Sequence, residues 1–204
     1  MAVSGLLCLA NCASVANLQT AETLSQGEIS NTIAMGYGEV DLDTDSTTEA
    51  VAGTATIDYM LRYGLTDVDE LGVRLTNFGA YISTDYKRKL YDDGSIKLAA
   101  GLALGGTKVT VTTNAGEAST TFFDIAVPLY ADYWLDETKA LFVSPKYMLS
   151  MISGTGTSDT YHRLGGSTGF RWGKTQGMIA EVGYLANLSE DNSDLWQFLV
   201  GGFF

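Results

Sequence analysis

The one histidine of the chain, His162, is the residue best suited to acid–base chemistry at neutral pH. Ser158 and Asp159 lie close to it in sequence, so a hydrolytic site is one hypothesis. Position 164, which shares a strand face with His162, is Leu, so no serine stands two residues along to pair with it. We interpret His162 as an incidental residue at a loop edge, and we expect no enzyme activity, no catalytic residue and no cofactor.

Carboxylates alternate in a second segment, Asp41-Leu42-Asp43-Thr44-Asp45, which Glu49 follows. Calcium loops alternate in this way, but Ser46 stands where the sixth-position glycine is needed and Ala52 where the twelfth-position glutamate is needed. We expect no metal site and interpret the segment as a solvated acidic loop. Weak binding of divalent cations and docking of a partner molecule remain open alternatives.

Composition argues against several classes of function and of site. The 24 acidic and 12 basic residues give a net charge of −12, which argues against binding nucleic acid through a basic face. The chain contains no run of about 18 apolar residues, the length that a transmembrane helix needs. Both cysteines, Cys8 and Cys12, lie in the first dozen residues, so the body of the chain has neither a disulfide framework nor a cysteine metal site.

From Glu28 onward the apolar residues recur with period 2, which indicates β-strands. In the clearest case Ile57, Tyr59 and Leu61 share one face, and Asp58 and Arg62 share the other. We predict ten strands, at about 28–40, 51–65, 71–76, 80–90, 96–105, 121–133, 141–151, 159–173, 177–188 and 195–204. The connections alternate between short ones, near 64–69, 91–95, 135–138 and 173–176, and longer ones, near 41–50, 106–118, 152–158 and 188–194; the abrupt connection at 77–79 is an exception.

Strands of this length with one apolar face, joined alternately by short turns and longer loops, are typical of an antiparallel up-and-down transmembrane β-barrel. A soluble barrel or sandwich is the alternative, with the apolar face turned inward. We expect the charged residues of the polar faces to pair across a plugged lumen, because about eight strands already enclose a space that side chains fill. These predicted lumen residues are Asp58, Arg62, Arg74, Asp85, Lys87, Asp124, Asp132, Lys146, Arg163, Arg171 and Glu181.

The final segment, Leu195–Phe204, places Trp196, Phe198 and Phe204 on one face and ends on an aromatic residue. It resembles the C-terminal strand of bacterial outer-membrane β-barrels, and the strings Arg62–Asp67 and Glu70–Leu75 resemble a short periplasmic hairpin of that family. The resemblance implies location in the outer membrane of a Gram-negative bacterium, with membrane lipids as partners. It also implies aromatic girdles at the two interfaces, for which the candidates are Tyr63, Tyr86, Tyr133, Tyr147, Trp172 and Tyr184.

The string Leu9-Ala10-Asn11-Cys12 resembles the lipobox of bacterial lipoproteins, which implies that Cys12 is acylated. Asn11 departs from the Gly or Ala usual before that cysteine, and a truncated signal sequence with no role for Cys12 is the alternative. We therefore divide the chain into residues 1–27, a signal remnant and periplasmic connecting segment, and residues 28–204, the barrel.

These observations favour a barrel with a structural or interaction role in the envelope, and another envelope protein is a further candidate partner. A narrow channel for small solutes is the alternative, and an outer-membrane hydrolase built on His162 is the least favoured hypothesis.

Overall fold

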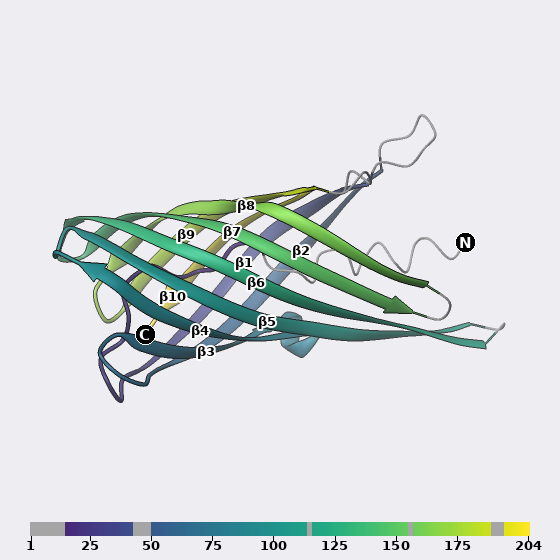
Figure 1. Ribbon diagram of the computed structural model, residues 1–204, viewed down its shortest axis with the longest axis horizontal. Helices are drawn as coiled ribbons and strands as arrows, with labels where there is room; N and C mark the ends of the chain where they lie inside the picture. The colour runs from purple at the N-terminus through teal and green to yellow at the C-terminus, as the bar shows by residue number, and fades with distance from the viewer. Residues whose placement is uncertain (1–14, 43–49, 114–115, 155–156, 189–193) are drawn as a thin grey trace.

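The computed structural model describes residues 15–42, 50–113, 116–154, 157–188 and 194–204, which form a closed barrel of ten antiparallel strands (Figure 1). The strands are β1 (Ile29–Leu42), β2 (Ala50–Gly64), β3 (Asp69–Thr76), β4 (Tyr81–Asp92), β5 (Ile96–Thr113), β6 (Gly116–Asp136), β7 (Lys139–Gly154), β8 (Thr157–Gly173), β9 (Gly177–Asn187) and β10 (Leu195–Phe203). The predicted fold class, an all-β up-and-down barrel of ten strands, is confirmed. No helix in the described part of the chain is both long and apolar enough to cross a membrane.

The first and last strands close the barrel. Thr32 of β1 lies opposite Phe203 of β10, and Val40 lies opposite Leu195. β10 pairs along its other edge with β9. The apolar terminal strand therefore has a hydrogen-bonded neighbour on each side and presents no open edge for aggregation.

The two faces of the barrel wall differ in polarity as predicted. Along β2, Ile57 and Leu61 are 43% and 40% exposed, whereas Asp58 and Arg62, on the opposite face, are 0% and 7% exposed. Apolar side chains thus cover the outside, and charged side chains lie inside. In water this distribution would be unfavourable on both faces, whereas a lipid bilayer favours the exterior. The inverted, soluble alternative does not fit this arrangement.

Aromatic side chains gather at two levels of the outer surface. Tyr63, Tyr133 and Trp172 lie near the ends of their strands at the short turns, and all three are exposed. Tyr147 and Tyr184, also exposed, lie toward the opposite, loop end. Trp196 of β10 and Phe204, which directly follows this strand, are eight residues apart, which corresponds to roughly 20 Å along the axis of a tilted barrel. The two levels lie toward opposite ends of the apolar outer surface, as the girdles of a membrane barrel do.

The strands at the loop end are longer than the sequence predicted. We expected loops at 106–118 and 152–158, but β5 continues to Thr113, β6 begins at Gly116, β7 ends at Gly154 and β8 begins at Thr157. These two expectations were wrong because antiparallel pairing continues beyond the apolar band, where Thr and Val still favour strands. Of the other two predicted loops, residues 43–49 and 189–193 lie outside the described residues.

The abrupt connection between β3 and β4 is the turn η1 (Asn77–Gly79). Asn77 and Phe78 have φ angles of 49° and 60°, a region that side chains larger than glycine seldom adopt. The Phe78 side chain is 91% exposed. The barrel wall is shorter at this turn than at β2. The last residue pair between β2 and β3 is Asp58 with Thr76, whereas β2 itself extends to Ala50.

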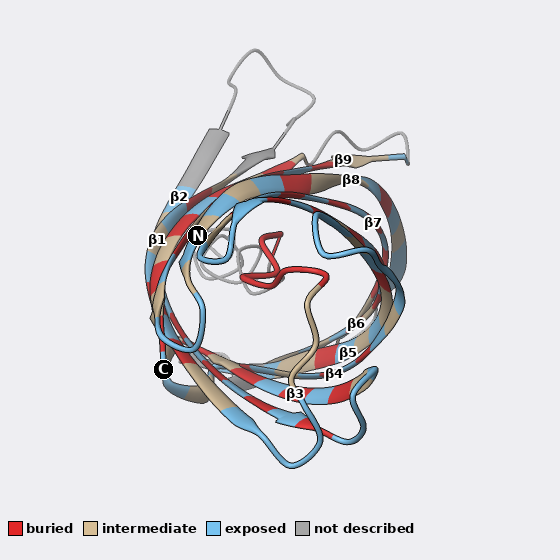
Figure 2. Ribbon diagram, turned by 90° about the vertical axis from the view of Figure 1, so that its left-hand side faces the viewer, coloured by how far each residue is buried: buried red, intermediate tan, exposed pale blue. Residues whose placement is uncertain are grey.

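Residues 15–24, the described part of the chain that leads toward β1, lie inside the barrel (Figure 2). These residues, which we call the lumen segment, run from the level of Gln197, near the loop end of β10, to Glu70 at the turn end of β3. We expected a periplasmic connecting segment here, whereas every residue from Val15 to Ala21 is buried in the lumen. Cys12 and the lipobox-like string lie outside the described residues, and lipidation of Cys12 stays a prediction.

Candidate functional site

The site that the fold builds is the lumen. Ten of the eleven charged residues predicted there are buried, and Arg171 is half-buried with its guanidinium directed at Thr20 of the lumen segment, 3.2 Å away. The buried ten are Asp58, Arg62, Arg74, Asp85, Lys87, Asp124, Asp132, Lys146, Arg163 and Glu181.

Sequence reasoning missed a twelfth lumen charge, Glu70. It was assigned to the turn before β3, but β3 begins at Asp69, and Glu70 is 1% exposed. Its carboxylate lies 2.5 Å from Arg62 Nε and 2.8 Å from Lys87 Nζ. Two signals could have found it: it shares a strand face with Gly72 and Arg74, and the eleven predicted charges are five acids against six bases. Glu70 makes the set neutral, as a poorly hydrated interior requires.

The charges form two ion-pair groups. Near the turn end, Arg62 bridges Glu70 and Asp85, with Nη2 2.9 Å from the Asp85 carboxylate. This pair passes directly over Gly72, where a Cβ would lie 2.5 Å from Asp85 Oδ2 and 2.6 Å from Arg62 Nη1. Toward the loop end, Arg74 donates to both oxygens of Asp58, at 3.1 and 2.6 Å. The wall is therefore cross-braced by charge-assisted hydrogen bonds between neighbouring strands.

The same set of polar side chains holds the main chain of the lumen segment. Gln197 Oε1 accepts the amides of Val15 and Ala16, at 3.1 Å each. The two carboxylate oxygens of Glu181 accept the next two amides, those of Asn17 at 2.7 Å and Leu18 at 2.5 Å. Four consecutive amides are thus bound by two side chains of β9 and β10.

Farther toward the turn end, acids of other strands continue this pattern. Asp132 accepts the amides of Ala21 and Glu22, at 2.8 and 3.3 Å. Glu70 accepts the amide of Leu24 at 2.9 Å. Seven amides of the segment are therefore held by side chains of the wall.

Cations bind the carbonyl oxygens of the segment. Lys146 donates to Val15 O at 2.5 Å, and Arg74 donates to Ala16 O at 2.6 Å. Lys87 donates to two carbonyls, those of Thr20 at 2.8 Å and Glu22 at 2.7 Å. Hydrogen bonds between charged side chains and peptide groups are stronger than neutral ones, so this ladder fixes the path of the segment.

Apolar side chains of the lumen segment also pack against the barrel wall. Val15 packs in a buried cluster with Met148 and Leu185, and Ala16 and Leu18 pack in another with Met60 and Leu199. Ala21 belongs to a third cluster. Three apolar contact points along the segment alternate with polar side chains, so the lumen is not uniformly polar.

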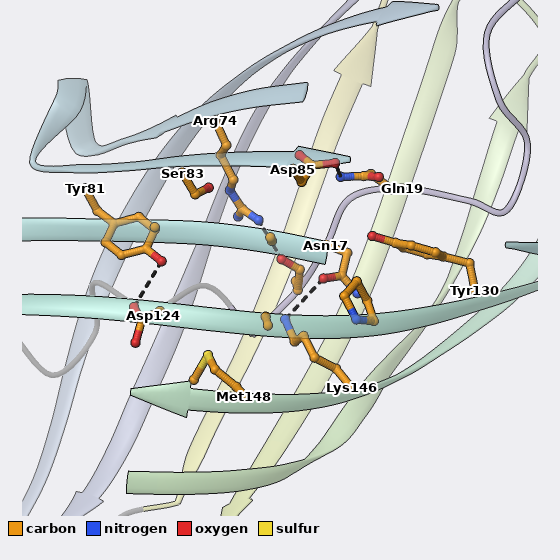
Figure 3. Close-up of a pocket in the computed structure, with 15 residues that line it drawn as sticks. Asn17, Gln19, Arg74, Tyr81, Ser83, Asp85, Asp124, Tyr130, Lys146 and Met148 are labelled. Carbon is orange, nitrogen blue, oxygen red and sulfur yellow. Dashed lines mark hydrogen bonds between the residues drawn. The ribbon is translucent and has the colours of Figure 1, made fainter. Parts of the chain in front are cut away.

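The free space beside the segment is small. In the close-up of Figure 3, a cavity of about 50 Å³ lies between the segment and the wall, next to the hydrogen bonds from Tyr81 to Asp124 and from Lys146 to Asn17. A second cavity of about 50 Å³ lies on the turn side, against Arg62 and Phe203. Each has room for one or two water molecules. These two cavities beside the segment are therefore of a size that water molecules fill.

A wider hollow opens at the turn end. It has a volume of about 390 Å³ and is bounded by Glu22, Lys97, Trp134 and Lys174 among others. Lys97 forms an ion pair with Glu22 at 2.9 Å and lies 4.6 Å above the Trp134 ring. The hollow ends against the lumen segment, of which Glu22 is part.

His162, the candidate for acid–base chemistry, faces away from the lumen. Its ring is exposed on the outer surface of β8, and its Nδ1 is hydrogen-bonded to the hydroxyl of Tyr147 at 2.6 Å. The structure does not bring it to the lumen carboxylates. Among the described residues, no group of three or more His, Cys, Asp or Glu side chains is placed to hold a metal ion.

Comparison with known proteins bears on the fold. No protein-family model matches the sequence, and no curated protein does. Solved structures do match: the translocator domain of the autotransporter NalP from Neisseria meningitidis has a TM-score of 0.55 and 10% identity, over 90% of this chain and 90% of that one. The β-domain of the Bordetella autotransporter BrkA has a TM-score of 0.54 and 9% identity, over 87% of this chain and 99% of that one.

At these identities the likeness concerns the fold alone. The chain has the fold of the bacterial outer-membrane β-barrels, and its apolar outer surface with two aromatic levels is the surface that such a membrane requires.

Proposed function

We propose that this protein is a closed, non-conducting barrel with a structural or interaction role in the bacterial envelope. The observation that carries the proposal is the lumen segment, which fills the bore from Val15 to Leu24 and is bound by charged side chains along its length. Cavities of about 50 Å³ beside it are too small for a metabolite to pass.

A non-enzymatic role is part of the proposal. The lumen acids Glu181, Asp132 and Glu70 already accept hydrogen bonds from peptide amides, so they are engaged in holding the segment. His162 lies on the outer surface beside Tyr147, where lipid or its headgroups surround it. Neither set resembles an accessible acid–base pair in a cleft.

The proposed partners are the lipids around the barrel and another envelope protein. For the second, the predicted contact is the acidic segment Asp41–Glu49, most of which lies outside the described residues. Replacing its four acids by amides should alter capture of the partner and leave the fold intact. An unchanged interaction profile would remove this segment as the docking site.

Electrical recording tests the proposal. Purified, folded protein inserted in planar bilayers should be silent, because the lumen segment occupies the bore. A channel function requires the segment to leave the lumen, and discrete, reproducible conductance steps from the unmodified protein would refute closure. Folding should be verified in the same sample by the difference in gel mobility before and after boiling.

A further inference from the structure

The wall recognises the lumen segment mainly through its main chain. Seven amides and four carbonyls of residues 15–24 are bound by side chains of the barrel; the amides belong to Val15, Ala16, Asn17, Leu18, Ala21, Glu22 and Leu24, and the carbonyls to Val15, Ala16, Thr20 and Glu22. Peptide groups are common to all sequences, so such contacts select the path of the backbone, which is bent where Leu18 has a φ of 54°.

Polar side-chain contacts of the segment are fewer than its main-chain contacts. Asn17 donates to Ser144 at 2.7 Å and accepts from Lys146 at 3.1 Å, Gln19 reaches Asp85 only at 3.4 Å, and Glu22 pairs with Lys97 at 2.9 Å. Val15, Ala16 and Ala21 are small, and the close contact between Val15 and Gly183 shows how little room the wall leaves: a Cβ at Gly183 would lie 2.7 Å from Val15 Cγ1. The lumen thus limits side-chain size beside Gly183 and makes a small number of specific contacts with the side chains of the segment.

The arrangement of wall charges also sets the direction of the chain. Near Val15 to Leu18, acceptors come from β9 and β10 (Glu181 and Gln197), whereas the donors Lys146 and Arg74 come from β7 and β3. Amides and carbonyls are met by groups of opposite polarity on different parts of the wall.

From this geometry we infer that the lumen is a binding site for a polypeptide that follows the bent path of residues 15–24 with a small side chain beside Gly183, and that residues 15–24 are an intramolecular occupant that a second peptide can replace. This rests on the proposed function in that the segment must close the lumen in the resting protein. If the segment withdrew, Glu181, Asp132 and Lys146 would lose their peptide partners. A peptide in trans offers the same donors and acceptors, which restores those charge-assisted hydrogen bonds.

A loosened full-length variant makes the site accessible. Asn17→Pro/Leu18→Pro removes the two amide donors to Glu181, and Leu18 has a φ of 54°, which proline cannot adopt. Asn17→Ala/Leu18→Ala is the matched control, because it removes the side chains and keeps both amides. Neither change touches a strand of the barrel. Thermolysin cleavage within residues 15–24 and bilayer conductance report whether the segment has left.

The probe is a fluorescein-labelled synthetic peptide with the sequence of residues 15–24, titrated in fluorescence polarisation. We expect saturable binding to the proline variant and at least about tenfold weaker binding to the unmodified protein and the alanine control, in which the site is occupied. A peptide N-methylated at the residues equivalent to Asn17 and Leu18 should bind about tenfold or more weakly, because two hydrogen bonds to a carboxylate are lost. A shuffled peptide of the same composition that places Leu or Gln at the position of Val15 should bind about tenfold or more weakly, because a larger side chain does not fit beside Gly183.

Three results would overturn the inference. Undiminished binding of the N-methylated peptide would show that the lumen side chains do not bind the peptide through its main-chain amides. Absence of saturable binding to a proline variant whose segment is cleaved would show that the lumen accepts no second peptide. Retention of the segment despite both prolines would show that the amides at Glu181 do not hold it. Conductance of the unmodified protein is a separate outcome, which would refute the proposed closure whether or not the peptide binds.

Discussion

Removing one partner of the Arg74–Asp58 pair should destabilise the barrel far more than removing both. Asp58 is fully buried, and its carboxylate receives two hydrogen bonds from Arg74 and one from Thr76, at 2.5 Å. Arg74 also donates to Ala16 O of the lumen segment. Arg74→Gln therefore leaves a buried carboxylate without its counter-charge, and it weakens the hold on the segment.

The magnitude follows from burial. Leaving one member of a buried ion pair uncompensated costs about 3–5 kcal/mol, so Arg74→Gln and Asp58→Asn should each lower the free energy of unfolding by that amount. The double variant replaces the pair with two neutral groups that can still hydrogen-bond, and it should lose only about 1–3 kcal/mol. The double-mutant cycle therefore predicts a coupling energy of at least about 3 kcal/mol.

The assay is urea unfolding of the protein in phospholipid bilayers, followed by tryptophan fluorescence and by the mobility of unboiled samples on gels. The exposed pair Lys139–Asp136, with 3.1 Å between charged atoms and both side chains nearly half exposed, is the control. Its coupling should stay below about 0.5 kcal/mol. Additive effects of the two lumen substitutions, with a coupling no larger than that of the control pair, would refute the reasoning that the lumen is poorly hydrated and charge-paired.

The remaining predictions concern the outer surface, the packing over a glycine and the candidate histidine. Leu129 lies on the lipid face of β6, four residues from Tyr133, so Leu129→Arg should cost about 2–4 kcal/mol in bilayer unfolding and Leu129→Met almost nothing; a neutral Arg substitution would contradict the membrane orientation. Gly72→Ala should lower the free energy of unfolding by about 1–3 kcal/mol, because its Cβ meets the Arg62–Asp85 pair. Gly202→Ala is the control, since the nearest atom to its Cβ is 3.7 Å away, and it should change the free energy of unfolding by no more than about 0.5 kcal/mol. Equal urea midpoints for the two variants would exclude the close approach at Gly72. His162→Ala should leave folding and any envelope phenotype unchanged, and loss of a hydrolytic activity in this variant would revive the hydrolase hypothesis.

The sequence was sufficient for the barrel wall. Alternation such as that of Ile57, Asp58 and Tyr59 is a local pattern with period 2, and it identifies each strand and its two faces without reference to the rest of the chain. The apolar C-terminal strand also implied a closed sheet, because an open one would expose it. The boundaries were less accurate, since strands that continue into water, such as β5 up to Thr113, lose the apolar face that marks them.

The lumen segment could not be read from the sequence in the same way. Residues 15–24 have no strand or helix period, and the wall binds their peptide groups, which every residue possesses. Glu70 was the exception, because the imbalance of one base among the predicted lumen charges required another acid. The polar wall was therefore predictable, whereas what it binds depended on the three-dimensional arrangement.

The central claim is that residues 15–24 lie in the lumen, and an engineered disulfide tests it most directly. A Cβ placed on Gly183 would lie 2.7 Å from Val15 Cγ1 and 3.4 Å from the Val15 carbonyl carbon, which is close enough for Val15→Cys/Gly183→Cys to form a disulfide in a Cys8→Ser/Cys12→Ser background. Val15→Cys/Val182→Cys is the control, because Val182 faces outward from the same strand. We predict near-complete oxidation of the first pair and none of the second in the folded protein, read by thiol labelling after denaturation. Free thiols at both positions of the first pair, in protein that shows the mobility shift of a folded barrel, would contradict the account.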